Sequence, residues 1–129
     1  MGAAGQRPPR VPPAPESLAT VARVVAIATD LMLASRVRTS LEGAGHEVEQ
    51  QAAIPDELDG VDLIVADLDV VAPEALGELD IPVIGFYQHT DTDTKSRAEA
   101  AGLAMAIPRS RMVRELPELV DRLLSRSDR

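Results

Sequence analysis

The feature that most constrains the fold is a short apolar run at residues 61–69, Val-Asp-Leu-Ile-Val-Ala-Asp-Leu-Asp. Comparable apolar runs occur at 20–28, 81–87 and 103–107, but only this one ends in a pair of acids, Asp67 and Asp69. Runs of this length with apolar side chains on both faces are typical of strands buried in a parallel sheet. Asp67 is therefore expected at the carboxyl end of a central strand, and it is the first candidate for a functional residue.

The segments between these runs have helical patterns. Residues 31–42 place Leu33, Val37 and Leu41 on one helical stripe, and the Gly-Ala-Gly at 43–45 ends that helix. Further helices are predicted at 73–79, at 91–101 and at the C-terminus, where Pro117 marks either a late helix start or a kink. The segment at 46–51 has the weak pattern of an edge strand, and 55–60 leaves room for a turn or two of helix. Five strands that alternate with helices predict a parallel α/β sheet.

Length and composition indicate one domain and exclude several classes of function. In this chain of 129 residues, a single domain is predicted at 20–127. The tail at 1–19 has five prolines between 7 and 15, which favour a disordered, extended chain. The net charge of −8 argues against nucleic acid as a partner. Cysteine is absent, which excludes disulfides and thiolate metal sites, and no apolar run approaches the ~20 residues of a membrane helix. We therefore expect a cytoplasmic protein.

Functional groups in a parallel sheet gather at the carboxyl ends of its strands. We expect these ends to carry carboxylates, a phenol, an imidazole and a guanidinium, from Thr29, Asp30, Asp67, Asp69, Tyr87, His89 and Arg109. From the residues alone, Asp67 is interpreted as a strand-end carboxylate paired with Arg109, Tyr87 as a core residue and His89 as a loop residue.

The order of these elements resembles a response-regulator receiver domain of the CheY-like kind over about residues 21–126. The resemblance rests on four short segments in the same order and spacing, Asp62-Leu-Ile-Val-Ala-Asp67, Gly45-His-Glu-Val48, Ile81-Pro-Val-Ile84 and Ala101-Gly102. It implies a doubly wound, five-stranded, flavodoxin-like sheet in a three-layer sandwich, with the second and third helices shortened here.

The resemblance places the functional residues of receivers on a changed set of side chains. Asp67 falls on the phosphoacceptor aspartate. The two acids that hold Mg²⁺ in receivers fall on Ala28 and Thr29, with Asp30 one place beyond, so Asp30 and Asp67 are the remaining candidate ligands. The small hydroxyl residue falls on Tyr87, and the lysine falls on Arg109. Fewer acids should lower Mg²⁺ affinity, because hard cations rely on anionic oxygen ligands.

We therefore predict a degenerate receiver-like signalling module that is not an enzyme, acts through protein contacts and lacks standard phosphorylation of Asp67. Two alternatives stay open: a phosphorylatable receiver with an altered acid set, and a flavodoxin-like small-molecule binder. The partner surface that the resemblance implies combines the helix at 91–101, the strand at 103–107 and the last helix. It is expected to be basic through Arg97, Arg109, Arg111 and Arg114. A homodimer is also considered.

Overall fold

A computed structural model describes residues 21–88 and 92–127. The predicted tail at 1–19 and His89 lie outside these residues. In chain order the elements are β2 (Arg23–Ile27), α1 (Leu31–Gly43), β3 (Glu47–Gln51), β4 (Leu63–Asp67), α2 (Pro73–Gly77), β5 (Val83–Tyr87), α3 (Thr92–Ala101), β6 (Met105–Pro108) and α4 (Arg109–Ser127).

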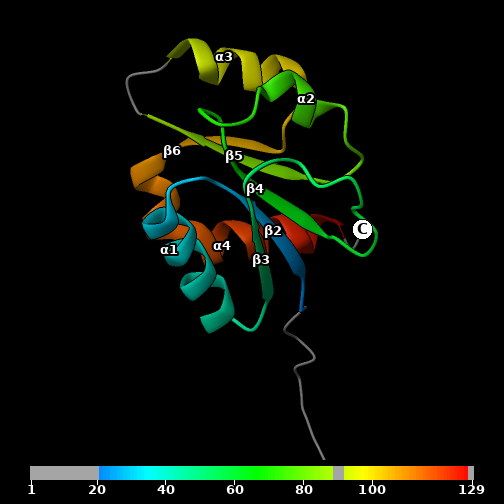
Figure 1. The fold of residues 1–129 in the computed structure, drawn as a ribbon, viewed down its shortest axis with the longest axis vertical. Coiled ribbons are helices and arrows are strands. Elements are labelled where there is room, and N and C mark those ends of the chain that lie inside the picture. The colour runs from blue at the N-terminus through cyan, green and yellow to red at the C-terminus, as the bar shows by residue number, and fades with distance from the viewer. Residues whose placement is uncertain (1–20, 89–91, 128–129) are drawn as a thin grey trace, which may run out of the picture.

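The strands form one parallel sheet in the order β3-β2-β4-β5-β6, which confirms the predicted fold class (Figure 1). The apolar strand β4 lies at the centre, with all five residues buried. The polar strand β3 lies at an edge, as its weak pattern predicted. This order reverses direction between β2 and β4, the place where flavodoxin-like sheets position functional groups.

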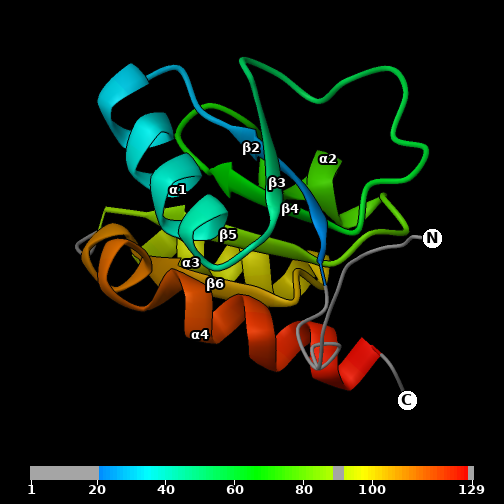
Figure 2. The ribbon, with the colours of Figure 1, turned by 90° about the horizontal axis from the view of Figure 1, so that it is seen from below.

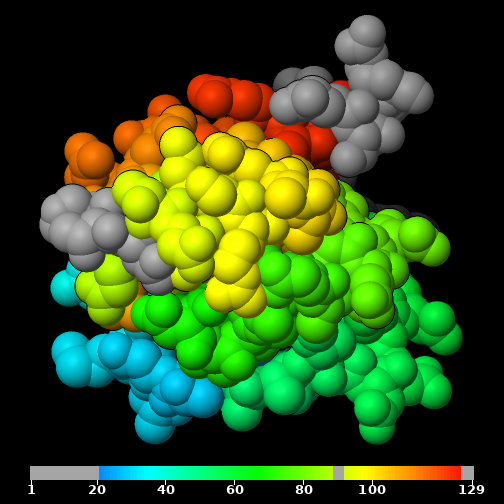
Figure 3. Space-filling view, turned by 90° about the horizontal axis from the view of Figure 1, so that it is seen from above, coloured from blue at the N-terminus to red at the C-terminus, as the bar shows by residue number. Residues whose placement is uncertain are grey.

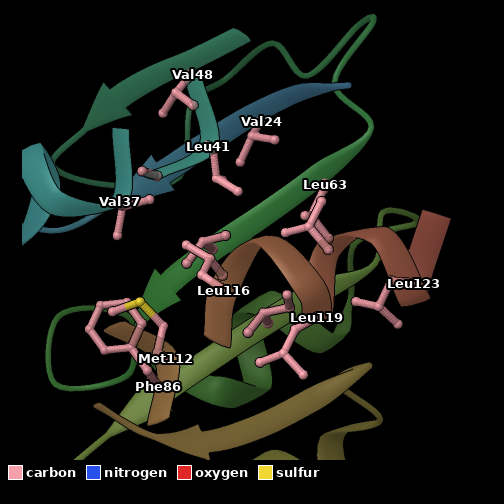
Figure 4. Packing of buried hydrophobic residues seen from close by; sticks show 14 of the residues in the cluster. Val24, Val37, Leu41, Val48, Leu63, Phe86, Met112, Leu116, Leu119 and Leu123 are labelled. Carbon is pink, nitrogen blue, oxygen red and sulfur yellow. The ribbon is translucent and has the colours of Figure 1, made fainter. Parts of the chain in front are cut away.

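Helices α1 and α4 lie side by side on one face of the sheet (Figure 2). Their apolar stripes and that face of the sheet share one hydrophobic core. Figure 4 shows Val37 and Leu41 of α1 beside Val24 and Val48 of the sheet, and Met112 of α4 against the ring of Phe86. The sulfur of a methionine packs favourably at an aromatic ring, so this contact suits a core with few aromatic side chains.

Helices α2 and α3 cover the opposite face, where a second core cluster forms (Figure 3). The turn or two of helix expected at 55–60 is absent, and an irregular segment joins β3 to β4. Ile54, Leu58 and Val61 of that segment pack on the second cluster, so three side chains cover the sheet without a regular helix. The expected shortening of the next helix is confirmed, because α2 has five residues.

Helix α4 resolves the ambiguity at Pro117. The helix begins at Arg109 and continues through Pro117 to Ser127, so Pro117 marks no helix start. Proline lacks the N–H that would bond to the carbonyl four residues earlier, but the buried stripe of Met112, Leu116 and Leu119 holds the helix on the sheet. Among the described residues, no helix combines the length and the apolar character that a bilayer span requires.

Candidate functional site

The carboxyl ends of β2, β4, β5 and β6 meet along one edge of the sheet. The strand register pairs Ile27 with Ala66, Asp67 with Phe86 and Tyr87 with Pro108. Helices α1 and α4 both begin at this edge (Figure 2). The edge therefore brings Asp67 together with the residues that follow β2 and β6, as the strand pattern predicted.

Asp67 is a buried carboxylate with both oxygens engaged. Its Oδ1 accepts a hydrogen bond from the backbone N–H of Asp69 at 2.9 Å, and its Oδ2 lies 3.5 Å from Nη2 of Arg109. The side chain of Asp67 is 5% exposed, and that of Arg109 is 35% exposed. The interpretation of Asp67 as a strand-end carboxylate paired with Arg109 is confirmed.

Burial is the main influence on the acidity of Asp67. Loss of hydration raises the pKa of the Asp67 carboxyl above its ordinary value, and the negative charges of Asp69 and Asp30 add to the rise. The Asp69 N–H and the Arg109 guanidinium act in the opposite direction but do not cancel the effect of burial. The pocket therefore favours a neutral Asp67 more than water does.

Asp30 has a structural task at the start of α1. Its Oδ1 accepts hydrogen bonds from the backbone N–H groups of Met32 at 3.0 Å and Leu33 at 3.2 Å, which makes it the N-cap of the helix. Thr29 is exposed immediately before it. A one-residue shift from the receiver acid pair thus leaves a single carboxylate here, and one of its oxygens already binds the helix.

Asp69 does not join Asp67 as a second strand-end ligand. It would share a face with Asp67 only if the chain stayed extended, but residues 68–70 form a turn. In that turn the carbonyl of Asp67 accepts hydrogen bonds from Val70 and Val71 at 2.9 and 3.1 Å. Asp69 is exposed and contributes its backbone N–H to Asp67.

Asp67 and Asp30 are the candidate Mg²⁺ ligands at this edge, and both already make other contacts. Mg²⁺ requires near-octahedral oxygen ligands and is usually held by one or two carboxylates with free oxygens. Both oxygens of Asp67 are engaged and Asp30 caps α1. Within residues 21–88 and 92–127, no three His, Cys, Asp or Glu side chains are grouped so that they could hold a metal ion.

Tyr87 lies in the core, and its neighbour Gln88 lines the surface at this edge of the sheet. It is 4% exposed and packs in the cluster under α2 and α3 with Leu68 and Ala98. Successive strand residues point to opposite faces, so Gln88 falls on the side of α1 and α4. The interpretation of Tyr87 as a core residue is confirmed, and sequence reasoning did not single out Gln88 beside it.

The four arginines expected to make one basic face do not do so. Arg97 binds Glu74 of α2 through two hydrogen bonds at 2.8 and 3.0 Å, and Arg111 binds Glu115 at 3.1 Å. Their charges are therefore offset by neighbouring carboxylates. The predicted basic surface across α3, β6 and α4 is thus offset at two of its four arginines, because side-chain pairing does not appear in a count of arginines.

The remaining arginines face a different neighbour, the helix α1. A cavity of about 460 Å³ lies at the start of α4, and we call it the arginine groove. It is lined by Arg36, Gln88, Arg109, Ser110, Val113 and Arg114. Sequence reasoning did not predict this grouping, which depends on the packing of α1 against α4.

Comparisons with known proteins agree on the fold. No protein-family model matches the sequence, and no curated protein matches it. Solved structures of receiver domains do match. A response regulator receiver domain protein from Clostridium thermocellum superposes with a TM-score of 0.73 at 15% identity, over 84% of this chain and 98% of that one.

Two further receiver domains give similar values. The CheY-like receiver domain protein from Methanospirillum hungatei JF-1 has a TM-score of 0.72 at 18% identity, over 84% and 98% of the two chains. The non-phosphorylated receiver domain of HemR from Leptospira biflexa has a TM-score of 0.68 at 21% identity, over 81% and 94%. This chain has the receiver-domain fold. Within that fold, its Asp67 has a guanidinium partner, and the single lysine of the sequence, Lys95, lies on α3 beside Glu99 at 3.7 Å.

Proposed function

We propose that the chain is a receiver-like regulatory module that acts by binding other proteins, and that Asp67 is not phosphorylated in the standard way. The observation that carries this proposal is the engagement of Asp67 itself. Its Oδ1 binds the Asp69 N–H and its Oδ2 faces Arg109. A phosphoacceptor needs a free oxygen for in-line attack and a divalent cation that neutralises the incoming phosphoryl oxygens.

Among the described residues, few side chains at this edge are placed to supply that cation with ligands. Asp30 holds the start of α1, Asp69 lies beyond a turn, and Ala28 offers no oxygen from its side chain. The proposal is accordingly that Mg²⁺ binds poorly and that the fold is used for contact with a partner protein.

The test uses the full chain, a small phosphodonor, Mg²⁺ and intact-mass spectrometry. The expected result is no gain of a phosphoryl group. A control receiver that is known to accept phosphate from the same donor shows that the conditions are adequate. A gain of one phosphoryl group that disappears in Asp67→Asn would overturn the proposal in favour of the phosphorylatable alternative.

The proposed contact surface is the one formed by α3, β6 and α4. Its charges are mixed, because Arg97 and Lys95 have acidic neighbours. A second surface competes with it at the start of α1, where Leu31 and Met32 are 72% and 76% exposed. Large apolar side chains exposed side by side are a common mark of a protein contact.

Affinity capture from cell extract separates the two surfaces. One variant carries Lys95→Ala and Arg111→Ala, and the other carries Leu31→Ser and Met32→Ser. Loss of the captured proteins in the first variant alone supports the α3-β6-α4 surface. Loss in the second variant alone moves the contact to α1. Sedimentation of the wild-type chain at several concentrations tests for the homodimer.

A further inference from the structure

The arginine groove concentrates positive charge in an acidic protein. The chain has a net charge of −8, yet three arginines and no acidic residue line this cavity. Within the described residues, neither Arg36 nor Arg114 belongs to an ion pair, and Arg109 has one partner, Asp67. Like charges placed together without counter-charges repel, so an anion bound in the groove would relieve this repulsion.

The start of α4 adds to this repulsion. The N-terminus of a helix carries a partial positive charge, which an acidic residue in the first turn normally offsets. The first turn of α4 has no acidic residue and begins with Arg109. An anion in the groove would satisfy both the helix terminus and the guanidinium groups.

Arg109, which lines the groove, also has a hydrogen-bond donor without an acceptor. Nε of Arg109 is buried and makes no hydrogen bond within the part of the chain that the structure describes. A buried donor of this kind costs stability unless it gains a partner. Arg114, by contrast, directs its Nε to the carbonyl of Ser110 at 3.4 Å.

Size and lining indicate what kind of anion fits. A volume of about 460 Å³ is within the range of small-molecule sites, and it exceeds what a single inorganic ion fills. Val113 gives the wall an apolar part, and Gln88 and Ser110 offer polar groups beside it. Guanidinium forks match phosphate oxygens two at a time, which favours phosphate over a smaller or softer anion.

We propose that the arginine groove is a binding site for a small organic phosphate. The phosphate lies against Arg36, Arg109 and Arg114, and the organic part lies against Val113 and Gln88. The site is separate from the chemistry of Asp67, so it holds whether or not that carboxylate accepts phosphate. It is linked to Asp67 through Arg109, which contacts the carboxylate and lines the groove.

Titration of the full chain with adenosine diphosphate, a hexose phosphate and inorganic phosphate tests the site. Calorimetry gives the affinities, and amide NMR shifts locate the binding. We expect at least one organic phosphate to bind more tightly than inorganic phosphate, with shifts centred on the amides of Ser110 and Val113. Each arginine contributes charged hydrogen bonds, so the double variant Arg36→Ala, Arg114→Ala should lose about 100-fold in affinity.

The matched control is Arg38→Ala with Arg122→Ala, which removes the same charges from the same two helices outside the groove. This control should stay within about threefold of wild type, and circular dichroism checks that both variants are folded. Equal losses in the two variants would show a general charge effect and overturn the proposal. So would a failure of all three compounds to bind, amide shifts elsewhere, equal affinity for inorganic phosphate, or tighter binding of a phosphoserine peptide.

Discussion

Removal of the Arg109 guanidinium should expose how strongly the fold depends on a charge partner for Asp67. Two unit charges 3.5 Å apart interact by about 1 kcal/mol in water and about 5 kcal/mol at an effective dielectric of ~20. The Arg109 side chain is 35% exposed, so the pair lies near the lower limit. We expect Arg109→Ala to lower the free energy of unfolding by about 1 to 2 kcal/mol near neutral pH.

A double-mutant cycle with Asp67→Asn isolates this interaction. Asparagine keeps an oxygen for the Asp69 N–H but removes the buried charge. Arg109→Ala should therefore cost much less in the Asp67→Asn background, and the coupling energy should account for most of the about 1 to 2 kcal/mol. Urea unfolding of the wild type, the two single variants and the double variant gives the four free energies required.

The pH dependence provides an independent check. Because burial raises the pKa of Asp67 in the folded state, the folded chain takes up this proton at a higher pH than the unfolded chain. As the pH falls through that raised pKa, Asp67 becomes neutral and the cost of Arg109→Ala should decline. A cost that is unchanged in the Asp67→Asn background, or unchanged on acidification, would refute the assignment of Arg109 as the charge partner of Asp67.

Three further predictions concern the rest of the fold. The Arg97 guanidinium lowers the pKa of Glu74 to about 2, so the stability that Glu74 gives above its ordinary pKa of 4.5 is lost as the pH falls toward 2. The free energy of unfolding of Glu74→Gln should therefore differ from that of the wild type near pH 6, and the two free energies should converge near pH 2. His46 is 5% exposed and its Nδ1 accepts the Ala22 N–H at 3.0 Å, so His46→Ala should cost about 2 to 3 kcal/mol, measured by urea unfolding against an exposed Glu47→Ala control. Leu116 is 1% exposed between α4 and the sheet, and Leu116→Ala should cost about 2 to 5 kcal/mol, which calorimetric melting would detect. A loss below about 0.5 kcal/mol in either of these core variants would contradict the packing described above.

The spacing of apolar residues was sufficient to predict the architecture, because strands and helices each require their own periodicity of apolar side chains. The buried run that ends at Asp67 became the central strand β4, and the polar segment after Gly45 became the edge strand β3. The segment at 55–60 failed this logic. Leu58 is its one large apolar residue, too little to reveal whether a helix or an irregular segment carries it onto the sheet.

Some features of the candidate site could be predicted from the sequence, and others could not. Sequence alone determined that Asp67 and Arg109 lie at the same edge of the sheet, because parallel strands bring their carboxyl ends together. Tertiary structure alone decided that Asp30 caps a helix, that Arg97 is neutralised by Glu74, and that Arg36 joins Arg109. Those outcomes depend on how helices pack and how far side chains reach. Neither the packing nor the reach has a period that could be recognised in the sequence.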